Sequence, residues 1–245
     1  MLNFIVDVAK QAGDVILRYY GNSEYKLKLD QSPVTVADLE SSKLITTLLE
    51  RETDYPVLSE ESVIDYKVRQ SWDTYWLVDP LDGTKEFINH NPEFTVNIAL
   101  IKNGRPVLGV VYSPVLNNCW WASKNCGAYK DGKHIFNNVN RPNMIGVDSR
   151  FHSNKQIESF FVRNNIHEIK SYGSSLKMCR IAEGIADIYP RLNGTMEWDT
   201  AASEIILYES GCEILSWPDR NLLQYNKSNL TNPYFVACRQ ELKWK

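Results

Sequence analysis

Long hydrophobic runs are missing from this sequence of 245 residues, although apolar residues make up 43% of it. No stretch approaches the roughly eighteen uninterrupted apolar residues that a membrane-spanning helix needs. The N-terminal segment MLNFIVDVAKQAGDV also lacks the basic and apolar segments that together mark a secretory signal. We therefore expect neither a transmembrane segment nor secretion.

Positive charge is scarce as well. The 27 Lys and Arg residues are outnumbered by 30 Asp and Glu residues, which gives a formal net charge of −3. No basic stripe is present, and this argues against a protein that binds nucleic acid. C-x-x-C pairs are also absent, since the five cysteines are scattered at Cys119, Cys126, Cys179, Cys212 and Cys238. This pattern favours reduced, mostly buried thiols in a cytoplasmic protein over disulfides or a zinc–thiolate site.

The most informative stretch lies in the first third of the chain, where an apolar run ends in acidic residues. Tyr75–Val78 has the aromatic and β-branched composition of a buried strand. Pro80 has no N–H to donate, so we expect the strand to end there. Asp79 and Asp82 would then lie on a tight turn. Gly83-Thr84 follows, with free backbone N–H groups at the start of a short helix.

Two carboxylates this close repel each other unless a cation lies between them or one of them stays protonated. A divalent metal ion that also contacts an anionic ligand would satisfy both the carboxylates and the free N–H groups. The alternative is an ordinary turn, because Pro, Asp and Gly favour turns for steric reasons.

Other acidic residues extend this pattern. Glu60 and Glu61 follow a second short apolar strand, and Asp38 and Asp199 each lie where a helix is predicted to begin. Ligands of α/β sheets gather at the ends of strands, which favours a functional role for the two glutamates. The functional interpretation of Asp199 is a carboxylate that points into the cleft between the two lobes. The alternatives are a solvated loop for the two glutamates and helix N-caps for the two aspartates.

The wider pattern predicts an α/β protein of one domain, 1–245, with two closely joined lobes at about 1–138 and 139–245. The first lobe is expected to contain helices at 2–20 and 37–51 and strands at 55–58, 75–78, 94–101, 106–112 and 119–122. The second lobe is expected to contain strands at 144–147, 186–189 and 212–215 and helices at 154–164, 175–183 and 199–209. The inner side of helix 37–51 is expected to carry Leu39, Leu44, Ile45, Leu48 and Leu49.

Three segments together resemble the signatures of the inositol monophosphatase superfamily: Leu58-Ser59-Glu60-Glu61, Asp79-Pro80-Leu81-Asp82-Gly83-Thr84 and Trp198-Asp199-Thr200-Ala201-Ala202. The resemblance covers essentially the whole chain. It implies a layered α-β-α-β-α sandwich and a magnesium-dependent, lithium-sensitive phosphatase that holds two or three Mg²⁺ ions.

Further segments resemble the CysQ-type 3′(2′),5′-bisphosphate nucleotidases of that superfamily: Asp79 to Phe87, Phe94 to Leu100, Gly173 to Lys177 and Tyr189 to Arg191. The implied reaction converts 3′-phosphoadenosine 5′-phosphate, or its phosphosulfate precursor, in sulfur assimilation and nucleotide recycling. An inositol or sugar phosphate phosphatase of the same fold is the nearest alternative, and a non-catalytic nucleotide sensor is a further one.

The resemblance also implies roles for individual residues. The metal ligands would be Glu60, Asp79, Asp82, Asp199 and the backbone carbonyl of Leu81. Asp38, Thr84 and Glu60 would be catalytic and act on a metal-activated water. The substrate contacts would be Glu60, Leu81, Asp82, Gly83, Thr84, His152, Ser174, Lys177, Arg191 and Asp199. A cytoplasmic monomer or homodimer is expected, with peripheral association at the inner membrane as an alternative.

Overall fold

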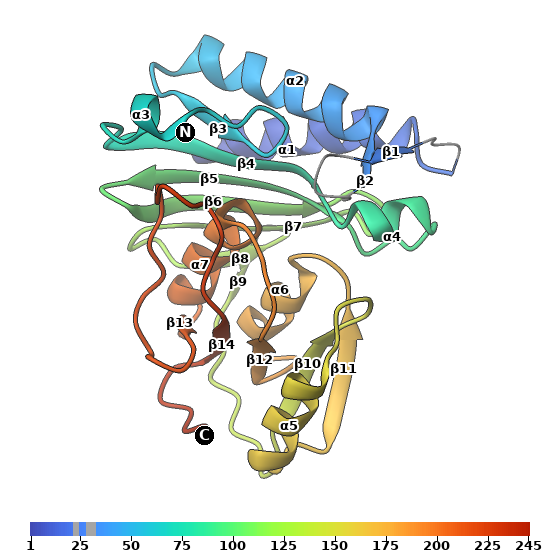
Figure 1. Ribbon diagram of the computed structural model, residues 1–245, viewed down its shortest axis with the longest axis vertical. Helices are drawn as coiled ribbons and strands as arrows, with labels where there is room; N and C mark the ends of the chain where they lie inside the picture. Colours follow the sequence, from blue (N-terminus) through green and yellow to red (C-terminus); the bar gives the residue numbers. More distant parts are fainter. Residues whose placement is uncertain (22–24, 28–32) are drawn as a thin grey trace.

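The computed structural model describes residues 1–21, 25–27 and 33–245. Two sheets dominate it (Figure 1). The larger contains seven strands in the order β3 (Val57–Ser59), β4 (Thr74–Asp82), β5 (Thr95–Lys102), β6 (Arg105–Ser113), β7 (Asn118–Ser123), β8 (Ala128–Lys130) and β9 (Lys133–Ile135). The smaller contains five in the order β11 (Glu168–Tyr172), β10 (Ile145–Ser149), β12 (Ile188–Arg191), β14 (Phe235–Arg239) and β13 (Cys212–Ser216). A separate two-stranded sheet pairs β1 (Tyr25–Leu27) with β2 (Pro33–Thr35) in antiparallel orientation.

Helices separate and cover the sheets (Figure 1). They are α1 (Leu2–Leu17), α2 (Val36–Glu52), α3 (Tyr66–Arg69), α4 (Thr84–Ile88), α5 (Lys155–Arg163), α6 (Leu176–Ala182) and α7 (Glu197–Glu209). One buried apolar cluster joins α1 and α2 to the large sheet, and a second joins both sheets to α6 and α7 between them. A third joins α5 to the small sheet. The order of layers is therefore α-β-α-β-α, as the family resemblance implied.

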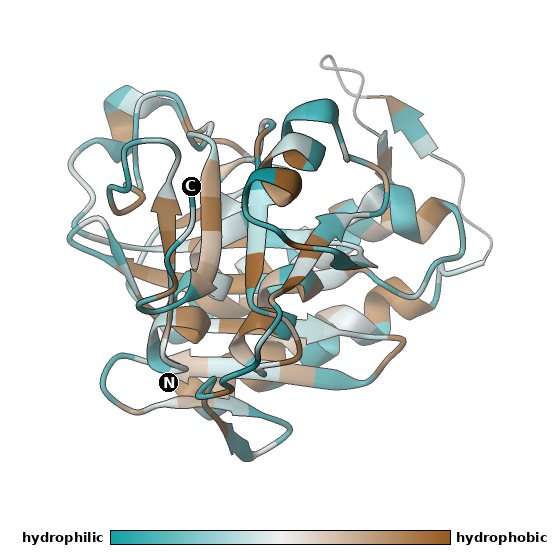
Figure 2. Cartoon of the chain, turned by 90° about the horizontal axis from the view of Figure 1, so that it is seen from below, coloured by the Kyte–Doolittle hydropathy of each residue, from teal (hydrophilic) through white to brown (hydrophobic). Residues whose placement is uncertain are grey.

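The distribution of hydrophobic and hydrophilic residues agrees with this layered arrangement. Figure 2 shows hydrophobic stretches along the interior strands and helices, and hydrophilic ones in many peripheral loops. No helix among the described residues combines the length and the apolar character needed to cross a membrane. The five cysteines are unpaired, and all but Cys126 are buried, as predicted.

Two details of the first lobe differ from the prediction. β4 continues past Pro80 to Asp82, because the pairing with β5 is interrupted after Asp79 and resumes at Asp82. Leu39 is 51% exposed, whereas Ile45 and Leu49 are buried. Residues six positions apart on an α-helix lie about 120° apart around its axis, so Leu39 cannot share the face of Ile45.

Helix α7 packs closely against the large sheet, and Gly109 of β6 makes this possible. A Cβ atom at Gly109 would lie 2.6 Å from the backbone oxygen of Ala202 and 2.6 Å from Cγ2 of Ile205. We expect Gly109→Ala to lower the free energy of unfolding by about 1–3 kcal/mol, because the backbone of α7 would have to move. Urea denaturation measures this effect. Gly194→Ala is the matched control, since nothing lies within 4 Å of the added Cβ, and equal midpoints for the two variants would contradict the prediction.

Candidate active site

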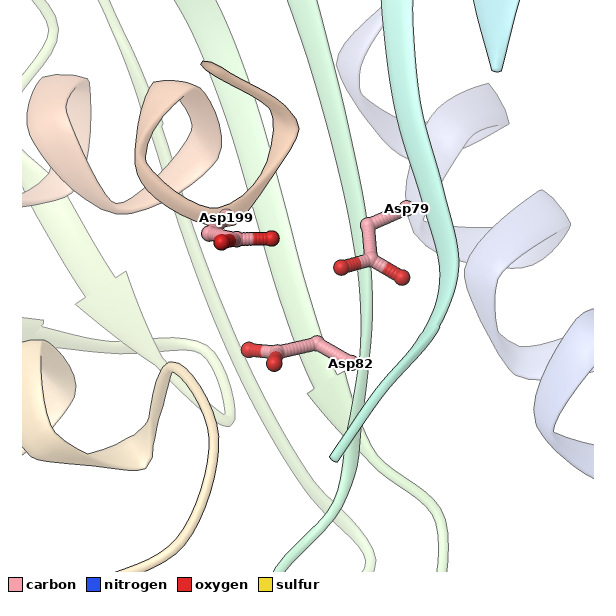
Figure 3. A group of neighbouring side chains, drawn as sticks. All are labelled: Asp79, Asp82 and Asp199. Carbon is pink, nitrogen blue, oxygen red and sulfur yellow. The ribbon is translucent and has the colours of Figure 1, made fainter. Parts of the chain in front are cut away.

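Three carboxylates converge where the large sheet meets α7. Asp79 and Asp82 come from β4, and Asp199 comes from the first turn of α7 (Figure 3). Oxygen atoms from the three side chains all lie within 4.8 Å of one another. Asp79 is buried, and Asp82 and Asp199 are partly exposed.

A β-bulge explains why the two carboxylates of β4 point the same way. Side chains three positions apart in a regular strand face opposite sides of the sheet. Here Asp79 pairs with Asn97 and Asp82 pairs with Thr95, so three steps on β4 match two steps on β5. The extra residue turns Asp82 to the side of Asp79. The Pro80 step therefore shapes the site instead of ending the strand.

Burial and close spacing raise the pKa of two of the three carboxyl groups. Burial, followed by the charges of Glu60 and Asp82, raises the pKa of the Asp79 carboxyl well above its ordinary value. Burial and the same two neighbours raise the pKa of Asp199 to about 7. Hard oxygen donors at this spacing suit a divalent cation such as Mg²⁺, which would also relieve the repulsion. The residues present therefore fit a divalent metal site.

Two acidic residues also accept hydrogen bonds at the N-termini of their own helices. Asp199 Oδ2 accepts a hydrogen bond from the backbone N–H of Met196 at 2.8 Å. Asp38 Oδ2 accepts from the backbone N–H of Thr35 at 2.8 Å. The N-caps are thus Met196 and Thr35, and each aspartate lies three residues later. The N-cap alternative for Asp38 and Asp199 is therefore wrong, because each reaches back toward the cap instead of being it.

Thr84 connects the buried Asp38 to the cleft. Its hydroxyl donates to Asp38 Oδ1 at 3.1 Å, and burial is the main cause that raises the pKa of Asp38. Gly83 precedes it with a φ of +91°, and a Cβ there would lie 3.2 Å from Cβ of Ser174. A glycine is therefore required for the turn that begins α4.

Two adjoining cavities, of about 390 and 420 Å³, open onto this cluster. They share Glu60, Asp82, Gly83, Thr84 and Asp199. Asp79 and Leu81 line only the second cavity. The acidic cluster thus lies at the junction of the two cavities.

The first cavity ends in a cationic region. Lys177 of α6 and Arg191 of β12 line it and are buried, and the Lys177 ammonium lies 5.7 Å from the centre of the Tyr189 ring. Burial lowers the pKa of Lys177 to about 8. Burial, followed by the charge of Arg191, lowers the pKa of His152 to about 4, so this side chain is neutral at pH 7.

Several polar atoms around this region lack protein partners. Among the residues that the structure describes, Ser149 Oγ, Ser174 Oγ and Arg191 Nε are buried without a hydrogen bond, and all three side chains line the first cavity. Buried polar atoms are seldom left unpaired in folded proteins. A ligand with several acceptor oxygens would satisfy them.

Most of the residues singled out from the sequence come together. Those with an expected catalytic, metal or substrate role all line one of the two cavities except Asp38, which reaches the cleft through Thr84. Glu61, the neighbour of Glu60, lines neither cavity. Sequence reasoning missed Ser149, Tyr189, Asn97 and Ser175. Asn97 carries a detectable signal, since it is a polar residue inside a strand and its neighbours there are apolar or small; Ser175 carries none on its own.

Comparisons with known proteins agree with the motifs. The sequence pattern of the inositol monophosphatase family matches residues 1–241. The 3′(2′),5′-bisphosphate nucleotidase CysQ of Salmonella typhimurium is 43% identical over 243 residues, which cover 96% of this chain and 98% of the relative. The crystal structure of CysQ from Bacteroides thetaiotaomicron has a TM-score of 0.88 and 40% identity, with 98% of both chains covered.

A more distant likeness concerns the fold alone. The structure of the Thermotoga maritima IMPase has a TM-score of 0.82 at 23% identity and covers 96% of this chain and 91% of that one. The resemblance found in the three acidic segments is therefore confirmed over nearly the full length. The chain belongs to the inositol monophosphatase family.

Proposed function

We propose that this protein is a 3′(2′),5′-bisphosphate nucleotidase, which hydrolyses the 3′-phosphate of 3′-phosphoadenosine 5′-phosphate to give AMP and phosphate. The observation that carries this proposal is the pairing of two features in one cleft. An acidic cluster suited to divalent cations adjoins a buried cationic region that contains Lys177 and Arg191. The relatives named CysQ, at up to 43% identity, support the same activity.

We further propose that Mg²⁺ ions bind between the carboxylates of Glu60, Asp79, Asp82 and Asp199 and the carbonyl of Leu81. Carboxylate, carbonyl and water oxygens are the donors that Mg²⁺ prefers. When bound, the ions would lower the pKa of water and neutralise charge on the phosphate and the leaving oxygen.

The protein's own groups would position the attacking water. The Thr84 hydroxyl donates a hydrogen bond to Asp38, so its lone pairs are left to accept a hydrogen bond from water in the cleft. Asp38 is in turn held by Thr35, which fixes the direction of the Thr84 hydroxyl. A proton released by the water can therefore pass through Thr84 to Asp38. The N–H groups of Gly83 and Thr84 would hold phosphate oxygens.

The second phosphate of the substrate would occupy the cationic region. Arg191 and Lys177 supply positive charge, and the unpaired hydroxyl of Ser174 supplies a further donor. His152, neutral at pH 7, would donate one N–H. An inositol monophosphate has no second phosphate, so these buried groups would stay unpaired with that substrate.

A comparison of substrates tests the proposal. Phosphate release from 3′-phosphoadenosine 5′-phosphate, inositol 1-phosphate and fructose 1,6-bisphosphate is measured side by side with Mg²⁺. We expect the bisphosphorylated nucleotide to have the highest kcat/KM. Preference for inositol 1-phosphate would favour the related phosphatase, and nucleotide binding without turnover would favour a sensor.

We expect Lys177→Ala and Arg191→Ala to raise KM for the bisphosphate about 10- to 100-fold with a smaller change in kcat. A cationic contact to a remote phosphate stabilises ground and transition states about equally, and hydrogen bonds to charged groups contribute about 1.5–3 kcal/mol. Steady-state kinetics measure the split. Lys133→Ala, at an exposed position of β9, is the control. An unchanged KM with kcat abolished would show that Arg191 acts elsewhere.

We also propose that the protein acts in the cytoplasm as a monomer or homodimer. Five unpaired thiols support a reducing compartment. Light scattering coupled to size-exclusion chromatography determines the oligomeric state, for a chain of 28.2 kDa.

A further inference from the structure

Ser175 lies at the junction of three elements of the active site. Its hydroxyl is 2.8 Å from Asp82 Oδ2 at the end of β4. It is also 3.1 Å from the backbone oxygen of Asp199 in α7. The side-chain amide of Asn97 in β5 donates to it at 2.9 Å. One buried side chain therefore contacts two of the three clustered aspartates, the carboxylate of Asp82 and the backbone of Asp199.

The hydroxyl of Ser175 is not used to cap its own helix. Ser175 is the N-cap residue of α6, yet its side chain makes no capping hydrogen bond. A serine at this position ordinarily accepts a hydrogen bond from a backbone N–H of the first turn. Here the hydroxyl contacts Asp82 and Asp199 instead. It therefore makes contacts within the acidic cluster and does not cap α6.

The partners of Ser175 are themselves fixed. Thr95 Oγ1 donates to Asn97 Oδ1 at 2.9 Å, so the NH₂ group of Asn97 must point toward Ser175 and Asp82. This NH₂ group lies 3.3 Å from Asp82 Oδ2. Asp82 Oδ2 thus receives two donors, and its other oxygen stays available for a cation.

We propose that Ser175 is a positioning residue for the metal site, which sets the orientation of the Asp82 carboxylate and its spacing from Asp199. This inference rests on the proposed metal site. Donors that hold a ligating carboxylate tune metal affinity, and their loss typically costs about 10- to 100-fold. Ser174 and Lys177, which are neighbours of Ser175 in the chain, line the first cavity with its cationic region. This segment therefore also joins the metal site to the substrate site.

The test compares two buried serines. Ser203 of α7 is 1% exposed, and its hydroxyl has no hydrogen-bond partner among the described residues. Ser175→Ala and Ser203→Ala therefore remove the same atom, with and without the contacts in question. Ser175→Thr keeps the hydroxyl. Mn²⁺ is the probe, because electron paramagnetic resonance counts the free ion directly without any turnover.

We expect Ser175→Ala to weaken Mn²⁺ binding about 10- to 100-fold. Ser203→Ala and Ser175→Thr should bind within about threefold of the wild type. The Mg²⁺ concentration that gives half-maximal hydrolysis should rise in parallel for Ser175→Ala, and saturating Mg²⁺ should restore most of kcat. A purely structural role would instead lower the melting temperature of the metal-free protein without changing the Mn²⁺ affinity.

Two outcomes would overturn the inference, and they can be told apart. If Ser175→Ala binds Mn²⁺ like Ser203→Ala, while Asp79→Asn binds poorly, the metal site stands and Ser175 does not position it. If the wild type and Asp79→Asn bind Mn²⁺ equally, the proposed metal site itself is wrong, and the role of Ser175 falls with it.

Discussion

Exhaustive chelation of divalent ions is expected to lower hydrolysis of 3′-phosphoadenosine 5′-phosphate by at least about 1,000-fold, which corresponds to about 4 kcal/mol of transition-state stabilisation. The cluster of Asp79, Asp82 and Asp199 brings negative charge to the place where the phosphate must bind. Without cations, the carboxylates would repel the substrate instead of binding it.

The assay is phosphate release after dialysis against EDTA, with and without added Mg²⁺. Mg²⁺ should restore the rate, and excess Ca²⁺ should inhibit it, because the larger ion tolerates looser geometry and would misplace the attacking water. EDTA saturated with Mg²⁺ controls for the chelator itself. Full activity after chelation would exclude Glu60, Asp79, Asp82 and Asp199 as essential metal ligands.

Asp79→Asn is expected to reduce kcat by about 1,000-fold or more. An amide keeps the shape of the side chain but removes one negative charge and one acceptor oxygen from the centre of the cluster. Asp199→Asn should behave similarly. Asp73→Asn is the matched control, since Asp73 is exposed just before the other end of β4. Turnover within tenfold of the wild type would show that Asp79 is dispensable.

Asp79→Asn should not destabilise the metal-free protein. Burial and neighbouring charges raise the pKa of Asp79 and that of Asp199, the latter to about 7. A carboxyl with a raised pKa stabilises the folded state below its unfolded value, near 4, and this contribution is lost as the pH rises through the folded value. At pH 8 the metal-free Asp79→Asn variant should therefore melt at or above the wild-type temperature. A clear decrease would show that Asp79 is needed for folding.

Local patterns predicted many of the helices and strands and the acidic segments, whereas the layered sandwich was implied by the family resemblance. The predicted strands 94–101 and 106–112 correspond to β5 and β6, and the predicted helix 199–209 corresponds to α7. Acidic residues at strand and helix ends identified the carboxylates of the cluster. These features need no knowledge of distant contacts.

Other features depend on contacts between segments far apart in the chain. β14 (Phe235–Arg239) was missed because a short apolar run has no period of its own, and pairing with β12 and β13 makes it a strand. β11 is an exposed edge strand with few apolar residues. Ser175 was only the first residue of the predicted helix 175–183, and its role depends on residues 78 and 93 positions away.

The hydrogen bonds at the starts of α2 and α7 give the site a built-in reporter. The amide protons of Thr35 and Met196 are held by Asp38 and Asp199, which are also proposed to take part in catalysis and metal binding. Exchange of these two protons with deuterated water depends on how often the hydrogen bond from each amide to its carboxylate breaks. Amide exchange at Thr35 and Met196 can therefore follow the state of the two carboxylates separately, without substrate and without substitution.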